Sequence, residues 1–368
     1  MRFLIVDTAY SSFISWFYAQ NPTIAGASYA EQYQAIDQAF FHSACAWAKP
    51  LRDLGHDVLD ITANNPTLQV RWCLENGLGD VIKSCADEYI LGGISIKSSR
   101  SMAWLQEIVT AQIREFQPDI LLSANIYAFD SKFLFNVKKH YKLAIGQHAA
   151  PLMAGCDLSK FDLMISSMPV LVDHFRSLGL KAEYLRLAFD ERLLSCLKDG
   201  PCKYDLTFIG QAGALHQKRQ ALLLALAQQI PLDFFGDGDI SSANCGQLRQ
   251  HPALWGLNMY QALKDSRITL NSHLDIAGDF ANNLRLYEAC GVGSVLLTDR
   301  KSNLSEMFKE GEEILAYDSP AEALELAQYY LKEPIKRDEM AQRAQARVLR
   351  EHTYIQRVHE LLEIINKA

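Results

Sequence analysis

The chain has 368 residues, of which 49% are hydrophobic and 21% are charged, so it can build a large core. This length fits two domains better than one. A net charge of −7 argues against a general nucleic-acid binder, which usually carries a basic excess. The sequence has no run of about 18 apolar residues for a membrane span, and its first residues are too short in apolar content for a signal peptide. We therefore expect a cytoplasmic, globular, two-domain protein.

The eight cysteines are scattered along the chain, and no two of them form a C-x-x-C pair. This spacing indicates neither a zinc ribbon nor a thioredoxin-type redox site. Many of the cysteines lie in apolar runs, which favours buried, reduced thiols.

The first half of the chain alternates between short apolar runs, typical of buried strands, and longer amphipathic stretches, typical of helices. The expected strands are residues 3–6, 58–61, 120–123, 143–146 and 163–166, and the expected helices are residues 29–54, 69–77, 101–116 and 170–178. This order predicts a parallel sheet with right-handed crossovers. We interpret an aromatic cluster at residues 10–18 as core rather than as a sugar-binding surface.

The pattern restarts after residues 191–204, a stretch with glycine, proline and charged residues that we interpret as a linker. Expected strands at 206–210, 232–236, 268–271 and 294–299 alternate with helices at 218–229, at 258–264 and from 320 onward. The fold class is therefore α/β, with two Rossmann-like domains facing each other across a cleft. The domains are residues 1–190 and 205–350, and residues 351–368 form a C-terminal helix that can cross back to the first domain. Ligands of such sheets bind beyond the carboxyl ends of the strands.

The most informative motif is residues 282–293, which read as a short helix stopped by glycine. It places Arg285 in the first helical turn, where the helix dipole disfavours a cation by roughly 0.3–1 kcal/mol. An anion at the site would explain the arginine, because helix N-termini bind phosphates through free backbone N–H groups. Glu288 lies one turn further on, on the same face. We therefore predict that a nucleotide diphosphate and its ribose are contacted by Asn283, Leu284, Arg285 and Glu288.

A second candidate phosphate loop, residues 210–219, joins an expected strand to an expected helix. It lacks the G-x-G-x-x-G and Walker patterns, but two cations again open the helix. Gly210, Lys218 and Arg219 are therefore candidate donor-binding residues. The alternative, a plain strand–helix turn with solvated charges, stays open.

Gly236 and Asp237 follow the next strand, in the segment Asp237-Gly238-Asp239. Such a pair of carboxylates could bind Mg²⁺ or Mn²⁺ beside a diphosphate. The glycines on each side also make an ordinary tight turn after a strand, which is the interpretation we favour. We expect this turn to lie near the nucleotide base or sugar, and we expect no bound metal.

Three further polar residues are candidate catalytic groups. His148 follows the strand 143–146 and could act as a general base. Asp7 ends the first strand and could orient or deprotonate an acceptor hydroxyl, and Asp279 could receive a sugar hydroxyl. Their structural alternatives are a hydrogen-bonded loop histidine, a helix cap, and an acid favouring the positive end of a helix.

The second half of the chain resembles the C-terminal domain of GT-B-fold glycosyltransferases, most closely the CgeB-like, spore-maturation-type group with a group-one-type C-terminal domain. The resemblance covers residues 204–362 and is carried by the segments 205–210, 268–271, 283–291, 304–308, 311–313 and 352–357. The order and spacing of these segments are specific, although no single motif is decisive. The first half shares only the strand–helix rhythm.

This resemblance implies a nucleotide-sugar donor on the second domain and an acceptor on the first. It assigns the donor ribose to Glu288, and the diphosphate to Arg285 together with Lys218 or Arg219. It also implies that no metal is needed, because these cations can take that role.

The sequence departs from the GT-B pattern in two places. Many such enzymes carry an acid before the ribose glutamate in a Glu-x7-Glu pattern, but here Phe280 or Ala281 stands there and the nearest acid is Asp279. The glycine pair that commonly follows the first strand is also missing. These departures leave the stereochemical course and the acceptor contacts open.

We therefore predict a glycosyltransferase that moves a sugar from a nucleotide diphosphate donor, with UDP as the expected carrier, to a hydroxyl of a glycan, lipid-linked sugar or protein. Catalysis would rest on positioning and on electrostatic stabilisation of the departing diphosphate. No further cofactor and no nucleic-acid partner are expected, and any membrane contact would be peripheral. Two alternatives stay open: a nucleotide-sugar 2-epimerase of the same fold, and a non-catalytic nucleotide-sugar-binding protein.

Overall fold

The computed structural model describes residues 1–41, 43–80, 103–212, 216–238, 240, 245–273 and 278–367. Its contacts divide the chain into two compact units, residues 1–186 with 358–368, and residues 187–357. The stretch 191–204, which we predicted as a linker, holds the 3-10 helix η3 (Glu191–Cys196) and belongs to the second unit. The last helix, α14 (Tyr354–Lys367), starts in the second unit and ends in the first.

The first unit is built on a six-stranded parallel sheet with the order β2-β1-β3-β4-β5-β6. Its strands are β1 (Arg2–Asp7), β2 (Asp57–Thr62), β3 (Ile120–Ser123), β4 (Leu143–Gln147), β5 (Leu163–Ser166) and β6 (Ala182–Tyr184). The first five confirm the expected strands. The sixth was not predicted, because three residues with Glu183 in the middle do not form an apolar run.

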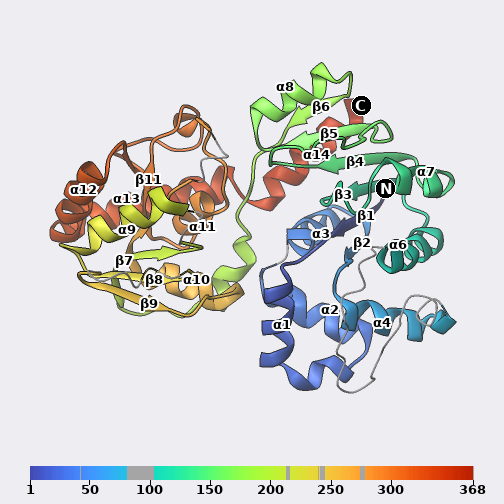
Figure 1. Ribbon diagram of the computed structural model, residues 1–368, viewed down its shortest axis with the longest axis horizontal. Coiled ribbons are helices and arrows are strands. Elements are labelled where there is room, and N and C mark those ends of the chain that lie inside the picture. The colour runs from blue at the N-terminus through green and yellow to red at the C-terminus, as the bar shows by residue number, and fades with distance from the viewer. Residues whose placement is uncertain are drawn as a thin grey trace. The chain divides into compact units, whose positions relative to one another are not determined.

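Helices surround this sheet (Figure 1). They are α1 (Ser11–Gln20), α2 (Tyr29–Asp37), α3 (Ser43–Asp53), α4 (Pro66–Glu75), α6 (Ala103–Phe116), α7 (Ser131–Val137) and α8 (Pro169–Ser177), with the 3-10 helices η1 (Pro22–Gly26) and η2 (Lys138–His140). The single helix expected at residues 29–54 is wrong: it is split into α2 and α3. Phe40 lies between them at φ 53°, a left-handed conformation that an α-helix cannot contain.

The aromatic cluster of residues 10–18 lies on α1 and its N-cap residue, and it is only partly core. Phe13 and Phe17 are buried, as predicted, whereas Tyr10 is 70% exposed. The cysteine interpretation is also only partly right. Of the six cysteines that the structure describes as free, Cys73 and Cys290 are buried, and the other four are partly or fully exposed.

The second unit contains another six-stranded parallel sheet, with the order β12-β11-β10-β7-β8-β9. Its strands are β7 (Tyr204–Ile209), β8 (Leu232–Phe235), β9 (Leu248–His251), β10 (Ser266–Leu270), β11 (Val295–Asp299) and β12 (Leu315–Tyr317). Two strands, β9 and β12, were not among the expected ones: β9 is a mostly polar edge strand with no buried residue, and β12 has only three residues.

The helices of the second unit, besides the start of α14, are α9 (Gln217–Ala227), α10 (Gly256–Lys264), α11 (Arg285–Gly291), α12 (Pro320–Lys332) and α13 (Pro334–Glu351), with the 3-10 helix η6 (Leu304–Glu306). Leucines of α9 pack on Leu206 and Phe234 of the sheet in one continuous apolar core. None of the helices in the described part of the chain is both long and apolar enough to cross a membrane.

The strand order of the second sheet reverses between β7 and β10. The chain runs outward from β7 to β8 and β9 on one side, and from β10 to β11 and β12 on the other. In an open parallel sheet, this reversal leaves a crevice at the carboxyl ends of the two central strands, where ligands bind. The residues that follow β7, β10, β11 and β12 are therefore the first place to look for a site.

Candidate functional site

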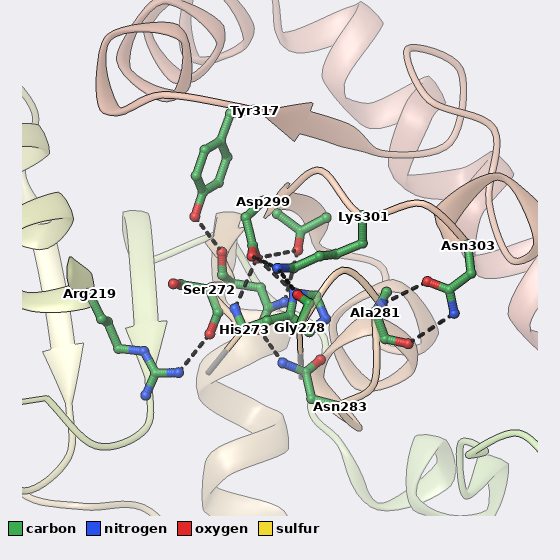
Figure 2. Close-up of polar contacts among 12 residues, drawn as sticks. Arg219, Ser272, His273, Gly278, Ala281, Asn283, Asp299, Lys301, Asn303 and Tyr317 are labelled. Atoms are coloured by element: carbon green, nitrogen blue, oxygen red, sulfur yellow. Dashed lines mark hydrogen bonds and ion pairs between the residues drawn. The ribbon is translucent and has the colours of Figure 1, made fainter. Parts of the chain in front are cut away.

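Polar side chains gather at the carboxyl ends of β10, β11 and β12 in the second unit (Figure 2). They come from five places in the sequence: the first turn of α9, the residues after β10, the approach to α11, the end of β11 and the end of β12. Each place is brought to this edge because parallel strands all end on the same side of a sheet. We refer to this group as the switch-point cluster: Arg219, Ser272, His273, Asn283, Asp299, Lys301 and Tyr317.

Arg219 spans the strand-order reversal with two hydrogen bonds. Its Nη1 donates to the carbonyl of Gln211 at 2.8 Å and its Nη2 donates to the carbonyl of Ser272 at 2.7 Å. Its guanidinium also lies 5.3 Å from the centre of the Phe208 ring. Burial lowers the pKa of Arg219, but an arginine remains charged at neutral pH. Its Nε is buried and has no hydrogen-bond partner among the described residues.

His273, which is buried, and Asp299, whose side chain is 22% exposed, form a pair at the carboxyl ends of β10 and β11. The imidazole Nδ1 lies 2.7 Å from Asp299 Oδ1, and the same oxygen accepts the backbone N–H of His273 at 2.9 Å. Burial works to raise the pKa of Asp299, but the hydrogen bonds and charge of His273 outweigh it, so the pKa is lowered. The carboxylate therefore stays ionised and fixes the orientation of the ring.

Lys301 and Tyr317 complete the surroundings of this pair. Lys301 Nζ lies 3.4 Å from Asp299 Oδ2 and donates to the carbonyl of Gly278 at 2.8 Å. The Tyr317 hydroxyl donates to the carbonyl of Asn271 at 2.8 Å. Burial and Asp299 raise the pKa of Tyr317, so this hydroxyl remains a donor at neutral pH.

Asn283, one of the predicted donor contacts, joins the approach to α11 to the end of β10. Its Nδ2 donates to Asn271 Oδ1 at 2.8 Å, and Asn271 Nδ2 donates to Thr298 Oγ1 at 2.9 Å. The amide oxygen of Asn283 is buried and has no hydrogen-bond partner in the described part of the chain. Asn271 therefore holds Asn283 in place while leaving one acceptor unused.

Arg285 and Glu288 face each other on the first turn of α11. Arg285 Nη1 lies 2.9 Å from Glu288 Oε2, and Tyr260 of α10 donates to Glu288 Oε1 at 3.1 Å. The Nη2 of Arg285 donates to the carbonyl of Ile209, the last residue of β7, at 3.3 Å. The ion pair with Glu288 offsets the unfavourable interaction between Arg285 and the helix dipole. From the sequence, we had explained the position of this arginine by a bound anion alone. Nη1 is nevertheless not aligned for a hydrogen bond to any described residue.

The remaining predicted donor contacts lie at the same edge of the sheet but differ in exposure. Gly210 and Gly236 directly follow β7 and β8 and lie close together, since a Cβ on Gly236 would lie 1.7 Å from the Gly210 carbonyl oxygen. Lys218, Asp237 and Leu284 are exposed. Asp239, residues 213–215 and residues 275–277 lie outside the described residues. The structure therefore describes only part of the D-x-D segment, of the loop 210–219 and of the loop before Asp279.

The Asp279 loop is held by backbone contacts rather than by its carboxylate. The carbonyl of Asp279 accepts hydrogen bonds from the backbone N–H and the hydroxyl of Ser302 at 3.0 and 2.9 Å. The neighbouring Ala281 is clamped by Asn303, whose Oδ1 accepts its N–H at 2.7 Å. The exposed carboxylate of Asp279 borders a hollow of about 460 Å³ that Arg300 and Lys301 also line.

The first unit carries the other two catalytic candidates at the carboxyl edge of its own sheet. Asp7 ends β1, is buried, and accepts the N–H of Thr8 at 2.7 Å. His148 follows β4, with its Nε2 3.3 Å from the Tyr127 hydroxyl. Burial lowers the pKa of His148, although backbone hydrogen bonds work in the other direction. With β3 between their strands, the two residues are roughly 10 Å apart across the sheet.

Sequence reasoning missed His273, Asp299, Lys301, Tyr317 and Tyr260. A usable signal existed for two of them: His273 follows an expected strand, as His148 does, and Asp299 ends one, as Asp7 does. Tyr260 lies inside a helix and Tyr317 ends a short buried strand, and an aromatic residue in such a place is usually core. Only the packing shows that their hydroxyls reach the site.

Comparison with known proteins gives one family and a set of related structures. Residues 218–363 match a family model described as glycosyl transferase-like. No curated protein matches the sequence. Over the whole chain, the structure is similar to AviGT4, a glycosyltransferase involved in avilamycin A biosynthesis (TM-score 0.59, 13% identity, 100% of this chain and 97% of that chain).

The protein has the GT-B fold. Its structure is also similar to HepE of Anabaena in complex with UDP-glucose, with TM-score 0.60, 12% identity and 100% of both chains covered. A third relative in structure is sucrose-phosphate synthase from Thermosynechococcus elongatus, with TM-score 0.58, 9% identity and 100% and 98% covered. The predicted GT-B fold is thus confirmed. The family match over the second domain agrees with the predicted glycosyltransferase, and the comparisons favour neither alternative.

Proposed function

We propose that this GT-B protein transfers a sugar from a nucleotide diphosphate donor, and that the diphosphate binds where the strand order reverses between β7 and β10. The observation that carries the proposal is a pair of arginines at this point. Arg219 and Arg285 each hold a backbone carbonyl at the end of β7, Gln211 and Ile209 respectively. Each also keeps one buried nitrogen without a hydrogen-bond partner among the described residues.

These unused donors are costly unless a ligand satisfies them. A buried polar group without a partner costs about 1–3 kcal/mol. Arg219 Nε has no hydrogen-bond partner among the described residues, whereas Arg285 Nη1 keeps its ion pair with Glu288 but has no aligned hydrogen bond. A phosphate oxygen accepts charge-assisted hydrogen bonds from arginine N–H groups such as these. The same cations would stabilise the charge that develops on the departing diphosphate.

The nucleoside would lie beside this group. We assign the ribose hydroxyls to the Glu288 carboxylate, whose oxygens are oriented by Tyr260 and Arg285. Burial and the Glu288 charge raise the pKa of Tyr260, so its hydroxyl donates at any physiological pH. UDP is the carrier that we propose, supported by the structural similarity to HepE, which was crystallised with UDP-glucose. The motif 283–291 supports the CgeB-like group as the nearest branch.

The acceptor hydroxyl is assigned to the first domain. His148 is suited to receive its proton because a lowered pKa keeps the imidazole neutral at pH 7. Asp7 is the second candidate, since its buried carboxylate stands at the carboxyl end of β1. Asp279 is proposed as a contact of the transferred sugar, because its carboxylate is exposed beside a hollow.

The donor site is tested by Arg285→Ala in the full chain. We expect UDP to raise the melting temperature of the wild type, since a ligand at 100 times its Kd stabilises the folded state by about 2.7 kcal/mol. Arg285→Ala should lose this shift together with hydrolysis of UDP-sugars, while circular dichroism stays unchanged.

Arg343→Ala provides the matched control for this test. Arg343 lies in the same domain and also donates to a backbone carbonyl, that of Glu312, but at the surface. It should keep the full shift. An Arg285→Ala protein that binds and hydrolyses as well as Arg343→Ala would disprove the assignment.

A further inference from the structure

We propose that the outer face of α7 is a docking surface for a lipid bilayer with anionic headgroups. The surface consists of one exposed aromatic side chain, Phe135, together with the exposed side chains of Lys132, Lys139 and Lys160, and we refer to it as the α7 surface. It belongs to the first unit, whereas the proposed donor site belongs to the second. The proposal therefore goes beyond glycosyl transfer and does not depend on the donor site.

The sequence around α7 is basic, although the chain as a whole is acidic. Residues 131–156 contain four lysines and no acid, in a chain whose net charge is −7. The two acids that flank this stretch use their carboxylates to accept backbone N–H groups. Asp130 accepts that of Phe133 at 2.9 Å, and Asp157 accepts that of Ser159 at 2.9 Å. The stretch therefore concentrates positive charge on one part of the first unit.

The helix α7 turns one face to the core and the other to solvent, on the outside of the first unit (Figure 1). Leu134 and Val137 are fully buried in the core of this unit. Lys132 and Phe135 are exposed, and 68% of the Phe135 surface is in contact with solvent. Lys139 follows Phe135 by four residues, so helical spacing brings it to the same outer face. Phe135 thus lies in water among cations and adds little to the core.

Lys160 reaches this face from the loop that follows β4. The Ser131 hydroxyl accepts the backbone N–H of Lys160 at 3.1 Å and donates to the carbonyl of Asp157 at 2.8 Å. These two hydrogen bonds fasten the loop to the start of α7. As a result, the Lys160 ammonium lies 5.9 Å from the centre of the Phe135 ring.

The three lysines of the α7 surface form no ion pair with any residue that the structure describes. The next lysines along the chain differ in this respect. Lys138 pairs with Asp162 at 3.4 Å, and Lys142 pairs with Asp119 at 2.7 Å. The charge of the α7 surface is therefore available to an anionic partner.

The composition of the surface favours a bilayer over a protein or a nucleic acid. Protein interfaces are enriched in arginine and depleted of lysine, and bidentate recognition of carboxylates or bases uses the arginine fork. Every cation of the α7 surface is a lysine. A fluid bilayer requires no fixed geometry: each lysine near an anionic bilayer raises the affinity about fivefold, and an aromatic ring enters the interface between headgroups and acyl chains.

The second unit provides a matched control surface. Tyr329 is 46% exposed, and the Lys336 ammonium lies 5.0 Å from the centre of its ring. Lys336, however, pairs with Glu333 at 3.5 Å, and α12 itself carries two glutamates. This place therefore combines an exposed ring with a lysine, but without the excess of positive charge.

The test is cosedimentation of the full-length protein with vesicles of phosphatidylcholine, either pure or with about 40% phosphatidylglycerol, at about 50 mM and about 300 mM NaCl. We expect the wild type to bind only the anionic vesicles. The partition coefficient should fall at least about tenfold between the two salt concentrations, because salt screens the attraction of the lysines. The triple variant Lys132→Gln/Lys139→Gln/Lys160→Gln should lower it about 100-fold, at about fivefold per lysine.

Phe135→Ser should lower the partition coefficient about tenfold at both salt concentrations, because salt does not screen the burial of an apolar ring. Phe135→Trp should bind as the wild type does and show more fluorescence quenching by brominated lipid. Tyr329→Ser and Lys332→Gln/Lys336→Gln, the controls, should bind the anionic vesicles as the wild type does. All these side chains face solvent, so the melting temperature of every variant should stay near that of the wild type.

Three results would overturn the proposal. The first is equal binding of the wild type to both kinds of vesicle, and the second is equal binding of the wild type and the triple variant to the anionic ones. The third is binding of the wild type, but not of the triple variant, to a DNA duplex of about 20 base pairs without any binding to vesicles, which would assign the surface to nucleic acid. None of these measurements uses UDP or a sugar, so failure of the donor site and failure of the α7 surface are distinguishable.

Discussion

The Arg285–Glu288 pair on α11 offers the sharpest test of the site's energetics. The two side chains are 14% and 9% exposed, and the charges lie 2.9 Å apart. Removing one partner of such a buried pair leaves an uncompensated charge and costs about 3–5 kcal/mol. In Arg285→Met, Tyr260 still donates to Glu288, so we expect the lower end, about 3 kcal/mol.

This cost can be read as a melting temperature. One kcal/mol shifts the transition of a domain of 150–250 residues by roughly 2–4 °C, so Arg285→Met should lower the transition of the second domain by about 6–12 °C. Glu288→Leu should cost a similar amount because it strands the arginine. The double variant should be less destabilised than the sum of the two, with a coupling of about 2–3 kcal/mol.

Differential scanning calorimetry of the wild type, the two single variants and the double variant, all without ligand, measures this coupling. The control is Lys309–Glu312, an exposed pair of the same spacing with 63% and 65% of its side chains in solvent. An exposed ion pair contributes about 0–1 kcal/mol, so the double-mutant cycle of Lys309–Glu312 should show a coupling energy no larger than this. A coupling for Arg285–Glu288 no larger than that of Lys309–Glu312 would refute the expectation that burial makes this ion pair strongly coupled.

Four further outcomes are expected. Gly236→Ala should lower the free energy of unfolding by more than about 3 kcal/mol or prevent folding, because the new Cβ would overlap the Gly210 carbonyl. Gly311→Ala is the control: Gly311 has φ +76° and open space around it, so this variant should cost only about 1–2 kcal/mol. Urea unfolding of the two variants measures the difference. His148→Gln should lower turnover about 100-fold without changing UDP affinity. Because folding lowers the pKa of His148, its contribution to stability is present above pH 6.5 and is lost as pH falls. The melting temperature of His148→Gln should therefore change less between pH 7 and pH 5 than that of the wild type. An equal change in both proteins would contradict this. Asn271→Ala should cost about 1–3 kcal/mol and release Asn283, seen as a weaker UDP affinity. Donor hydrolysis should survive EDTA, and its loss with rescue by Mg²⁺ would overturn the metal-independent proposal.

The sequence by itself determined most of the strands of both sheets. Runs such as residues 3–6, 120–123 and 295–298 contain only apolar or small residues, and such runs fit strands that are buried on both faces. Their alternation with helices leaves parallel pairing as the consistent solution. Where the pattern was weak the prediction failed: polar β9 was missed, and the break at Phe40 depends on one backbone angle that no composition rule gives.

The candidate site was only half accessible from sequence. Arg219, Asn283, Arg285 and Glu288 could be named because charged and amide groups at expected helix starts are unusual. The partners of these residues could not be named, because each contact joins segments far apart in the chain, such as Arg219 with Ser272, 53 residues on.

The tertiary structure alone decided where two histidines with similar surroundings in the sequence lie. His251 and His273 both follow or end a strand, and each contacts an aspartate at 2.7 Å. The strand order puts His251 on the edge and His273 beside the reversal between β7 and β10. Local sequence fixes which residues form strands, because propensity and apolar patterning act over a few residues. Which strand ends meet depends on crossovers that span many residues, so the composition of the site is decided by the fold.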